Sequence, residues 1–291
     1  MELKEKFSIK NNILPLIFAV VVFIALSFAY YLEVIGLNSL PFSTEKILTT
    51  INPIDVGVGL LIYLKTSIDF ALFIGILMKK YPGLTNRYAI EIGTAVGNTL
   101  GTMLVLGLWV VFKEISILLG LMVLFASLVL FEMAASSLEH LYEADIDTED
   151  EVVVTKWQLS IANFIKTLLS PLLFFISPIL SKVMPSMSHN VENENPKSFF
   201  GLFLMSMSIP FILGLDDFAG YVPFFQVVNV FGFGIGVFLG HCILNILLFI
   251  NPKVTIKIIK NPVIAILGAI AFILLGGYGV YEAVKILNGL H

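Results

Sequence analysis

The sequence predicts an all-α polytopic membrane protein with seven transmembrane helices, or eight if one ambiguous stretch also crosses. We expect an N-terminal helix followed by two inverted three-helix repeats. Three observations lead to this prediction: an apolar composition, a series of apolar windows, and a pattern that occurs twice. Hydrophobic residues make up 58% of the 291 residues and charged residues 13%, against roughly 25% charged in an average soluble domain. With a mean hydropathy of +0.96, this much apolar surface requires lipid as its solvent.

Seven windows are long and apolar enough to cross the bilayer, which takes about 20 residues. The first, residues 13 to 31, follows the lysine-bearing start MELKEKFSIKNN. We predict that it is a retained helix and not a signal peptide, because its apolar run is long and no small-residue cleavage site follows. The other windows are residues 54 to 78, 88 to 111, 115 to 138, 198 to 222, 224 to 250 and 261 to 287.

Residues 159 to 183 form the ambiguous stretch, which contains Lys166, Pro171, Pro178 and Lys182. The prolines interrupt helical hydrogen bonding, and loop charge argues further against a crossing. If this stretch does not cross, one side of the membrane collects most of the cations and the other keeps Lys46, Lys113 and Lys285. The first side then holds Lys4, Lys6, Lys10, Lys79, Lys80, Arg87, Lys156, Lys166, Lys182, Lys197, Lys253, Lys257 and Lys260. The positive-inside rule therefore favours seven spans, a cytoplasmic N-terminus, an outside C-terminus, and an interfacial or re-entrant segment at 159 to 183.

A repeated pattern divides the chain. Residues 69 to 75 read DFALFIG and residues 217 to 223 read DFAGYVP, and Phe131-Glu132 resembles Tyr281-Glu282. The helix after each first motif carries glycines four apart, a spacing that lets two backbones approach closely: Gly93, Gly97 and Gly101, then Gly232, Gly236 and Gly240. We expect an N-terminal segment (1–53), a first repeat (54–138), an acidic cytoplasmic linker (139–197) and a second repeat (198–291). Three spans per copy give the copies opposite orientations, a recurring transporter plan.

Three carboxylates lie at matching positions of the two copies: Asp69, Asp216 and Asp217. A carboxylate in hydrocarbon costs several kcal/mol, on the order of 3 kcal/mol or more, unless it is paired, protonated or facing water. One interpretation is a polar lock between helices. The other is a site for a cation or proton, since adjacent Asp216 and Asp217 repel each other and one of them can hold a proton.

Other polar residues near the acids extend this candidate site. Lys65, one turn before Asp69, is placed to neutralise it when the site is empty. Oxygen ligands suit hard cations such as Mn²⁺, Ca²⁺ or Mg²⁺, and the candidates are Thr66, Ser67, Asn98 and Asn229. Each of these also suits a hydrogen bond between packed helices.

Three further residues, His241, Asn245 and Glu91, form a candidate polar path or gate. His241 and Asn245 are one turn apart, although a buried histidine is usually just hydrogen-bonded. Seven acids lie between Glu139 and Glu151; they suit a solvated linker or a cation-attracting mouth.

Several function classes have no support in the sequence. No nucleotide-binding, hydrolase or metalloprotease motif occurs, so we predict no enzymatic activity and no cofactor. A net charge of −4 argues against nucleic acid. Cys242 is the single cysteine, which excludes an intrachain disulfide. The expected partners are the lipid bilayer and a small inorganic cation, and the oligomeric state stays open.

Two segments resemble the TerC family of the LysE-type exporter superfamily, which includes cadmium- and manganese-export branches. LLIYLKTSIDFALFIGILMKKYPGLTNRYAIEIGTAVGNTLG is similar to the family's Ser-x-Asp-Asn helix, basic loop and small-residue helix, and LGLDDFAGYVPFFQVVNVFGFGIG to its Asp-Ser-x-Pro helix and Asn-Val-Phe stretch. The resemblance covers roughly residues 55 to 285. Asp69, Asp216 and Asn229 fall on motif positions; Phe70 stands in place of an Asn, Tyr63 of an acid and Asp217 of a Ser.

The resemblance implies a seven-helix inverted-repeat protein linked to export of metal ions, notably manganese, across the plasma (inner) membrane. Our leading hypothesis is therefore a divalent-cation exporter, with proton coupling, whose metal site holds Asp69, Asp216 and Asp217. An exporter of amino acids or other small organic solutes is the alternative within transport. A non-transporting scaffold or partner subunit is the alternative outside it.

Overall fold

A computed structural model describes residues 9–41, 45–143, 154–183, 198–226, 228–250, 255 and 261–289. Within these ranges all regular structure is helical, as predicted. The helices in order are α1 (Ile9–Asn38), α2 (Pro53–Thr66), α3 (Ile68–Lys80), α4 (Leu84–Phe112), α5 (Ser116–Glu143), α6 (Lys156–Val183), α7 (Phe199–Tyr221), η2 (Val222–Gln226), α8 (Val230–Ile250) and α10 (Pro262–Leu287).

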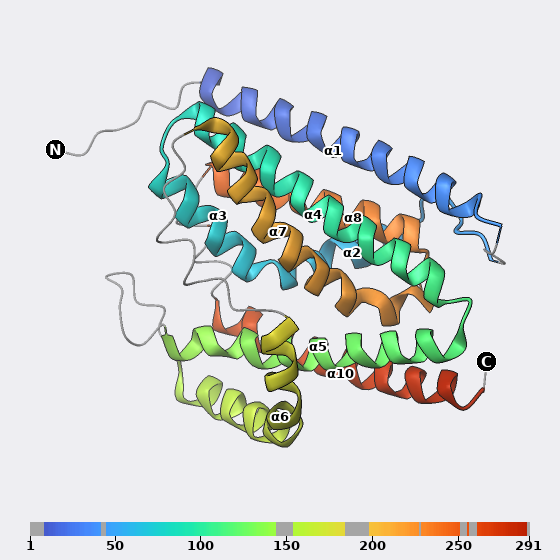
Figure 1. Cartoon of the computed structure of the whole chain (residues 1–291). Helices are drawn as coiled ribbons and strands as arrows, with labels where there is room; N and C mark the ends of the chain where they lie inside the picture. Colours follow the sequence, from blue (N-terminus) through green and yellow to red (C-terminus); the bar gives the residue numbers. More distant parts are fainter. Residues whose placement is uncertain are drawn as a thin grey trace.

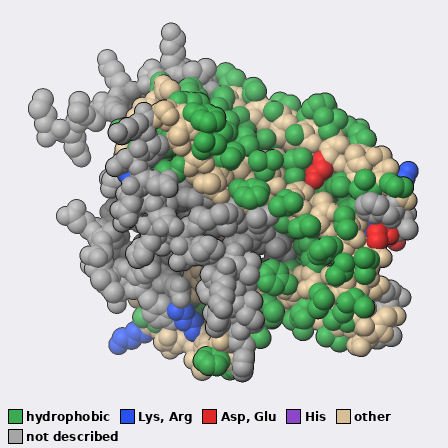
Figure 2. Space-filling model, viewed as in Figure 1, with side chains coloured by type: hydrophobic (Ala, Val, Ile, Leu, Met, Phe, Trp, Pro, Cys, Tyr) green, Lys and Arg blue, Asp and Glu red, His purple; other side chains and the backbone are tan. Residues whose placement is uncertain are grey.

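The chain is a polytopic helical membrane protein by the length and composition of its described helices. Five of them contain apolar stretches long enough to cross a bilayer: Leu16–Asn38, Leu84–Phe112, Ser116–Leu138, Val230–Leu248 and Pro262–Leu287. Two shorter apolar helices, Pro53–Leu64 and Phe199–Ser208, accompany them. Large apolar side chains such as Phe28, Leu61 and Leu274 are exposed, and apolar side chains cover much of the described surface in Figure 2. Lipid solvates such a surface, whereas water does not.

The predicted window 54 to 78 is wrong as one continuous helix. It is two helices, α2 and α3, that meet at Ser67, whose backbone ψ of 24° departs from helical geometry. The hydroxyl of Thr66 donates to the carbonyl of Tyr63 at 3.1 Å. Side-chain hydroxyls that bond to the preceding turn compete with regular helical bonding and bend helices. Hydropathy cannot register this effect, because the apolar run continues through the interruption.

The predicted window 224 to 250 also differs from the structure. Its first part belongs to the short helix η2, and α8 begins only at Val230. The prolyl nitrogen of Pro223 has no hydrogen to donate, which favours a break here. Asn229 therefore lies directly before α8 and not inside it, and its Oδ1 accepts a hydrogen bond from the backbone N–H of Phe231 at 2.9 Å. That is the geometry of a helix N-cap.

Three helix pairs build the body of the molecule: α4 with α7, α2 with α8, and α5 with α10. The helix α1 packs on α8 and α4. In Figure 1, α1, α4, α7 and α10 run in one direction along the bundle, and α5 and α8 run back. The helix α1 begins at one end of the bundle and α10 finishes at the other.

The helix α6 covers the predicted ambiguous stretch and packs against α5 and α10. In Figure 1 it begins at the end of the bundle where α5 finishes and lies beside that half of α5. Trp157, Phe164 and Phe174 are exposed on it. The acidic segment that precedes it, from 144 to 153, lies outside the described residues.

Glycines allow two of the pairs to approach at backbone distance. A Cβ added at Gly97 of α4 would lie 2.1 Å from the carbonyl oxygen of Met207 in α7, and one added at Gly236 of α8 would lie 2.2 Å from that of Val56 in α2. No side chain fits at either position. The spacing of four residues that suggested close packing is thus confirmed at these glycines.

Candidate functional site

A buried hydrogen-bonded chain joins α2 to α8. The hydroxyl of Tyr63 lies 2.8 Å from Nδ1 of His241, and Nδ2 of Asn245 lies 2.9 Å from Nε2 of the same ring. The three residues are 1%, 2% and 4% exposed, in that order. Because His241 and Asn245 are one helical turn apart, both reach the same side of α8.

The hydrogen bonds that join Tyr63, His241 and Asn245 can be arranged in two self-consistent ways. A neutral imidazole carries one N–H, so His241 donates from one nitrogen and accepts at the other. In the first arrangement Nδ1–H donates to the Tyr63 oxygen, and Nε2 accepts from the amide nitrogen of Asn245. In the second the tyrosine hydroxyl donates to Nδ1, and Nε2–H donates to the amide oxygen of Asn245, whose group is rotated by half a turn. Amide orientations and tautomers are set by such networks.

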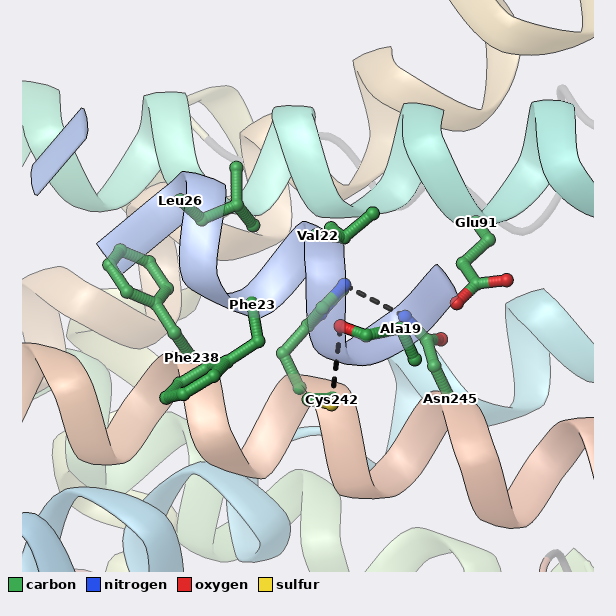
Figure 3. A pocket seen from close by; sticks show the side chains of 9 residues that line it. Ala19, Val22, Phe23, Leu26, Glu91, Phe238, Cys242 and Asn245 are labelled. Atoms are coloured by element: carbon green, nitrogen blue, oxygen red, sulfur yellow. Dashed lines mark hydrogen bonds between the residues drawn. The ribbon is translucent and has the colours of Figure 1, made fainter. Parts of the chain in front are cut away.

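Glu91 of α4 faces the far end of this chain across a cavity of about 210 Å³, its opening included. Three helices line the cavity: α1 with Ala19, Val22, Phe23 and Leu26, α4 with Glu91, and α8 with Phe238, His241, Cys242 and Asn245. Figure 3 shows the Glu91 carboxylate directed toward the amide of Asn245, beneath α1. The thiol of Cys242 is turned away to the carbonyl of Ala19, at 3.5 Å.

Two acceptor atoms in this cavity have no hydrogen-bond partner among the described residues. They are Oε2 of Glu91 and Oδ1 of Asn245, and both are buried. An unpartnered buried polar atom costs on the order of 1–3 kcal/mol. Two facing acceptors are relieved by a proton on the carboxylate, by a bound cation, or by rotation of the amide so that its N–H₂ meets a charged carboxylate. Each of these leaves Glu91 coupled to the state of Asn245.

The polar face of α4 continues beyond Glu91. Thr94, Asn98 and Thr102 are also buried, at 0%, 5% and 1% exposure. Positions 91, 94, 98 and 102 share one helix face, so a polar stripe runs along an otherwise apolar helix. The Nδ2 of Asn98 has no partner among the described residues. Glu91 is therefore the first of four buried polar residues on one face of α4.

The interruption between α2 and α3 lies one turn beyond Tyr63. Ser67 is 1% exposed, and its hydroxyl has no partner among the described residues. The backbone N–H of Ser67 still donates to the carbonyl of Tyr63, at 2.9 Å. The hydrogen-bonded chain and the interruption thus share the last turn of α2. Hydroxyl and carbonyl oxygens at such a break are the groups that hold ions in interrupted membrane helices.

The predicted acids lie on elements that the structure places, although their side chains are outside the described ones. Asp69 is in the first turn of α3, and Asp216 and Asp217 are near the end of α7. The side chain of Lys65, in the last turn of α2, is likewise outside the described part. The helix α3 contacts α4, α7 and α8. Whether these acids meet is therefore a prediction that stays open.

Asn229, the other predicted ligand, is engaged in local structure. Besides capping α8, its Nδ2 donates to the carbonyl and to the hydroxyl oxygen of Thr50, at 3.2 and 3.1 Å. These bonds attach the segment before α2 to the start of α8. Thr66 bonds to its own helix, as described above.

Sequence reasoning underestimated three members of the site. Tyr63 entered only as a departure from a family pattern, and Thr94 and Thr102 were not named. The signal for the threonines was present, because polar residues at positions 91, 94, 98 and 102 repeat with helical spacing. Nothing in the sequence pairs Tyr63 with His241, 178 residues apart, since that contact depends on how α2 packs on α8.

Comparisons of the chain with protein-family models, with curated proteins and with solved structures find no match. The similarity to the TerC family remains a prediction from the quoted residues. Among the side chains that the structure describes, no group of three or more His, Cys, Asp and Glu is placed to hold a metal ion. The three predicted aspartates are not among those side chains.

Proposed function

We propose that this chain is a membrane transporter that exports a small divalent cation. The observation that carries the proposal is a set of buried polar side chains, with unpartnered oxygen and nitrogen atoms among the described residues, inside a bundle of apolar helices. Such groups are costly in a membrane interior and mark ion or substrate pathways. Glu91, Asn98 and Ser67 contribute them from α4 and from the break between α2 and α3.

The helix pairing supports the inverted-repeat arrangement. If α2 with α3, α4 and α5 form one copy and α7, α8 and α10 the other, each first element packs on the second helix of the other copy. The two third helices, α5 and α10, pack on each other. A two-fold relation produces this crosswise pattern, and the glycines of α4 and α8 occupy equivalent positions in it. In inverted-repeat transporters the substrate site lies at the interface of the copies, beside interrupted helices.

The charge at the two ends supports a cytoplasmic N-terminus and seven crossings. Described cations at the end where α1 begins are Lys80, Arg87 and Lys156, next to the termini of α3, α4 and α6. Lys46, Lys113 and Lys285 lie at the opposite end, beside α2, α4 and α10. The described cations are thus three at each end, and the support comes from the sequence, whose other loop lysines fall on the first side under the seven-span prediction. The positive-inside rule then favours the cytoplasm for that side. In this arrangement α6 returns to the cytoplasmic side.

A divalent cation with manganese-like preferences fits the ligand types. Carboxylates of Asp69, Asp216 and Asp217, with hydroxyl and amide oxygens of Ser67 and Asn98, form a hard-oxygen set suited to Mn²⁺ or Mg²⁺. Export as the direction rests on the similarity to the TerC family. No enzymatic step is needed.

The test is manganese flux into vesicles that contain the purified protein. Wild type is expected to move Mn²⁺, and Asp69→Asn to lose most of that flux, because the substitution removes a ligand charge and keeps the shape. Glu282→Gln is the matched control, since this carboxylate pairs with Lys285 at 3.3 Å on α10. Equal flux in wild type and Asp69→Asn would refute the assigned site. Flux of an amino acid in place of Mn²⁺ would favour an exporter of organic solutes. The absence of any flux would favour a non-transporting scaffold or partner subunit.

A further inference from the structure

We propose that Glu91 is the proton-exchange residue of this transporter and that Asn245, His241 and Tyr63 transmit its charge state to the interruption between α2 and α3. The proposal rests on the proposed transport function and assigns its coupling site. Glu91 lies on α4 and faces α8 and α1, whereas the predicted aspartates belong to α3 and α7.

The cavity contains the groups that a proton-exchange site needs. Glu91 and Asn245 are each 4% exposed, and each has an unpartnered acceptor oxygen in the described structure. The α1 side of the cavity is apolar in its described lining. The titratable side chains that line the cavity with Glu91 among the described residues are His241 and Cys242 of α8, and Arg87 precedes Glu91 by one turn on α4. The cavity is not fully enclosed, and we take its opening as the route between the carboxyl group and water.

The two arrangements of the chain correspond to the two charge states of Glu91. With a proton on Glu91, the carboxyl O–H donates to Oδ1 of Asn245, the amide N–H₂ donates to Nε2 of His241, and Nδ1–H donates to the Tyr63 oxygen. Without that proton, the amide rotates so that its N–H₂ meets the carboxylate, and every following bond reverses. The imidazole changes tautomer by exchange with water: the Nδ1–H bond breaks, an Nε2–H bond forms, and the ring keeps one proton. The only net change is therefore the single proton released from Glu91.

The reversed hydrogen-bond directions affect the break between α2 and α3 through Tyr63. In the charged state its hydroxyl hydrogen is directed to His241; in the neutral state it is released to another acceptor. Tyr63 lies in the last turn of α2, and its carbonyl holds both the backbone of Ser67 and the hydroxyl of Thr66. A change in the hydrogen bonding of Tyr63 therefore alters the backbone of Thr66 and Ser67, the residues directly before α3. Asp69 lies in the first turn of that helix. Protonation of Glu91 and occupancy of the cation site are thereby linked, and such linkage is reciprocal.

The test uses the full-length protein in phosphatidylcholine and phosphatidylglycerol vesicles, with Mn²⁺ as the transported ion and a pH-sensitive dye inside. In wild type, Mn²⁺ entry is expected to release protons, and a pH gradient to drive Mn²⁺ accumulation. In Glu91→Gln, Mn²⁺ exchange without a gradient is expected to persist, while gradient-driven accumulation and proton release are lost. Glu33→Gln is the matched control, because this acid of α1 also has an unpartnered oxygen but does not line the cavity. Gradient-driven accumulation retained in Glu91→Gln would overturn the proposal.

A second measurement separates this proposal from the transport function itself. Infrared difference spectra of the detergent-solubilised protein after a pH step are expected to show a carboxylic-acid band and an amide side-chain band that change together. Both changes are expected to disappear in Glu91→Gln and to persist in Glu33→Gln. In Tyr63→Phe the carboxyl band is expected to remain while proton release per Mn²⁺ falls, as a positioning role requires. A wild type without Mn²⁺ flux refutes the transport function, whereas a wild type without a titrating Glu91 band overturns this inference whatever its flux.

Discussion

The pairs α4–α7 and α2–α8 use the same packing device but differ in what lies beside it. In each pair glycines bring one helix backbone onto the other: Gly97 onto the carbonyl of Met207, and Gly236 onto that of Val56. In α4–α7 the described polar contact is a hydroxyl bonded to backbone, from Ser206 to the carbonyls of Leu202 at 2.7 Å and Ala89 at 3.2 Å. In this pair the Ser206 hydroxyl is therefore satisfied by backbone carbonyls at the helix contact itself.

In the α2–α8 pair the contact is a series of hydrogen-bonded side chains, Tyr63, His241 and Asn245, that ends at a cavity. Gly240, one turn beyond Gly236, leaves room for the Tyr63 ring, which a Cβ at that position would meet at 2.7 Å. The glycine therefore admits an aromatic ring whose hydroxyl reaches His241. Two helix pairs can therefore share one kind of backbone contact and still differ in the side-chain chemistry beside it. In the described part of the molecule, the α4–α7 and α2–α8 pairs are alike in their glycine-mediated backbone contact, whereas the Tyr63–His241–Asn245 network belongs to the second pair.

The largest expected effect comes from closing the shared glycine contacts. Gly97→Ala and Gly236→Ala should each destabilise the protein by about 3 kcal/mol or more, since the new Cβ meets backbone that cannot move aside as a side chain would. Thermal unfolding in detergent measures the loss. Gly107→Ala is the control, because nothing lies within 4 Å of a Cβ there, and it should be neutral or slightly stabilising. Unequal losses at the two glycines would break the packing equivalence of the pairs.

A smaller effect is expected from removing the centre of the network. His241→Phe should cost about 2 kcal/mol, because it leaves the Tyr63 hydroxyl and the Asn245 amide without their ring partner. Tyr63→Phe alone should cost about 1 kcal/mol, and the double variant should cost less than the sum of the two. Ser206→Ala provides the comparison in α4–α7. Additive costs for Tyr63 and His241 would show that they do not act as one network.

The smallest effect tests the start of α8 against the start of α4. Asn229→Ala should cost about 1 kcal/mol, since it removes an N-cap bond and the attachment to Thr50. The helix α4 instead starts after Gly83, which has no side-chain cap and a φ of 114°. Gly83→Asn should therefore fail to stabilise α4, because that φ disfavours a side chain. Loss of Mn²⁺ affinity in Asn229→Ala without loss of stability would make Asn229 a ligand and not a cap.

The helices were predictable because hydropathy is a local property. Each predicted window, the ambiguous one included, contains a helix in the structure, and α10 begins within one residue of the expected position. Its cap is readable too: Asn261 precedes Pro262, and its side chain accepts from Val263 at 2.9 Å. The interruption at Ser67 and the late start of α8 were not predicted, since single hydroxyls and a proline act on hydrogen bonding and barely change mean hydropathy.

The candidate site was predictable in its residue types and not in its grouping. Glu91, His241 and Asn245 were each identified as polar residues in apolar windows, and the structure brings them together around one cavity. Tyr63 joins them from a helix remote in sequence. Asp69, Asp216 and Asp217 stay predictions, because their side chains lie outside the described ones.

The sequence alone predicted that the chain requires a lipid environment, which apolar windows contain the helices, and which helices carry small-residue faces suited to close contact. These properties follow from composition and periodicity along one segment at a time. Only the tertiary structure decided which smooth faces meet, that Tyr63 stands opposite His241, and that Glu91 faces Asn245 without a partner in the described structure. A hydrogen bond depends on the position of two atoms to within a fraction of an ångström, and that position is set by the packing of several helices at once.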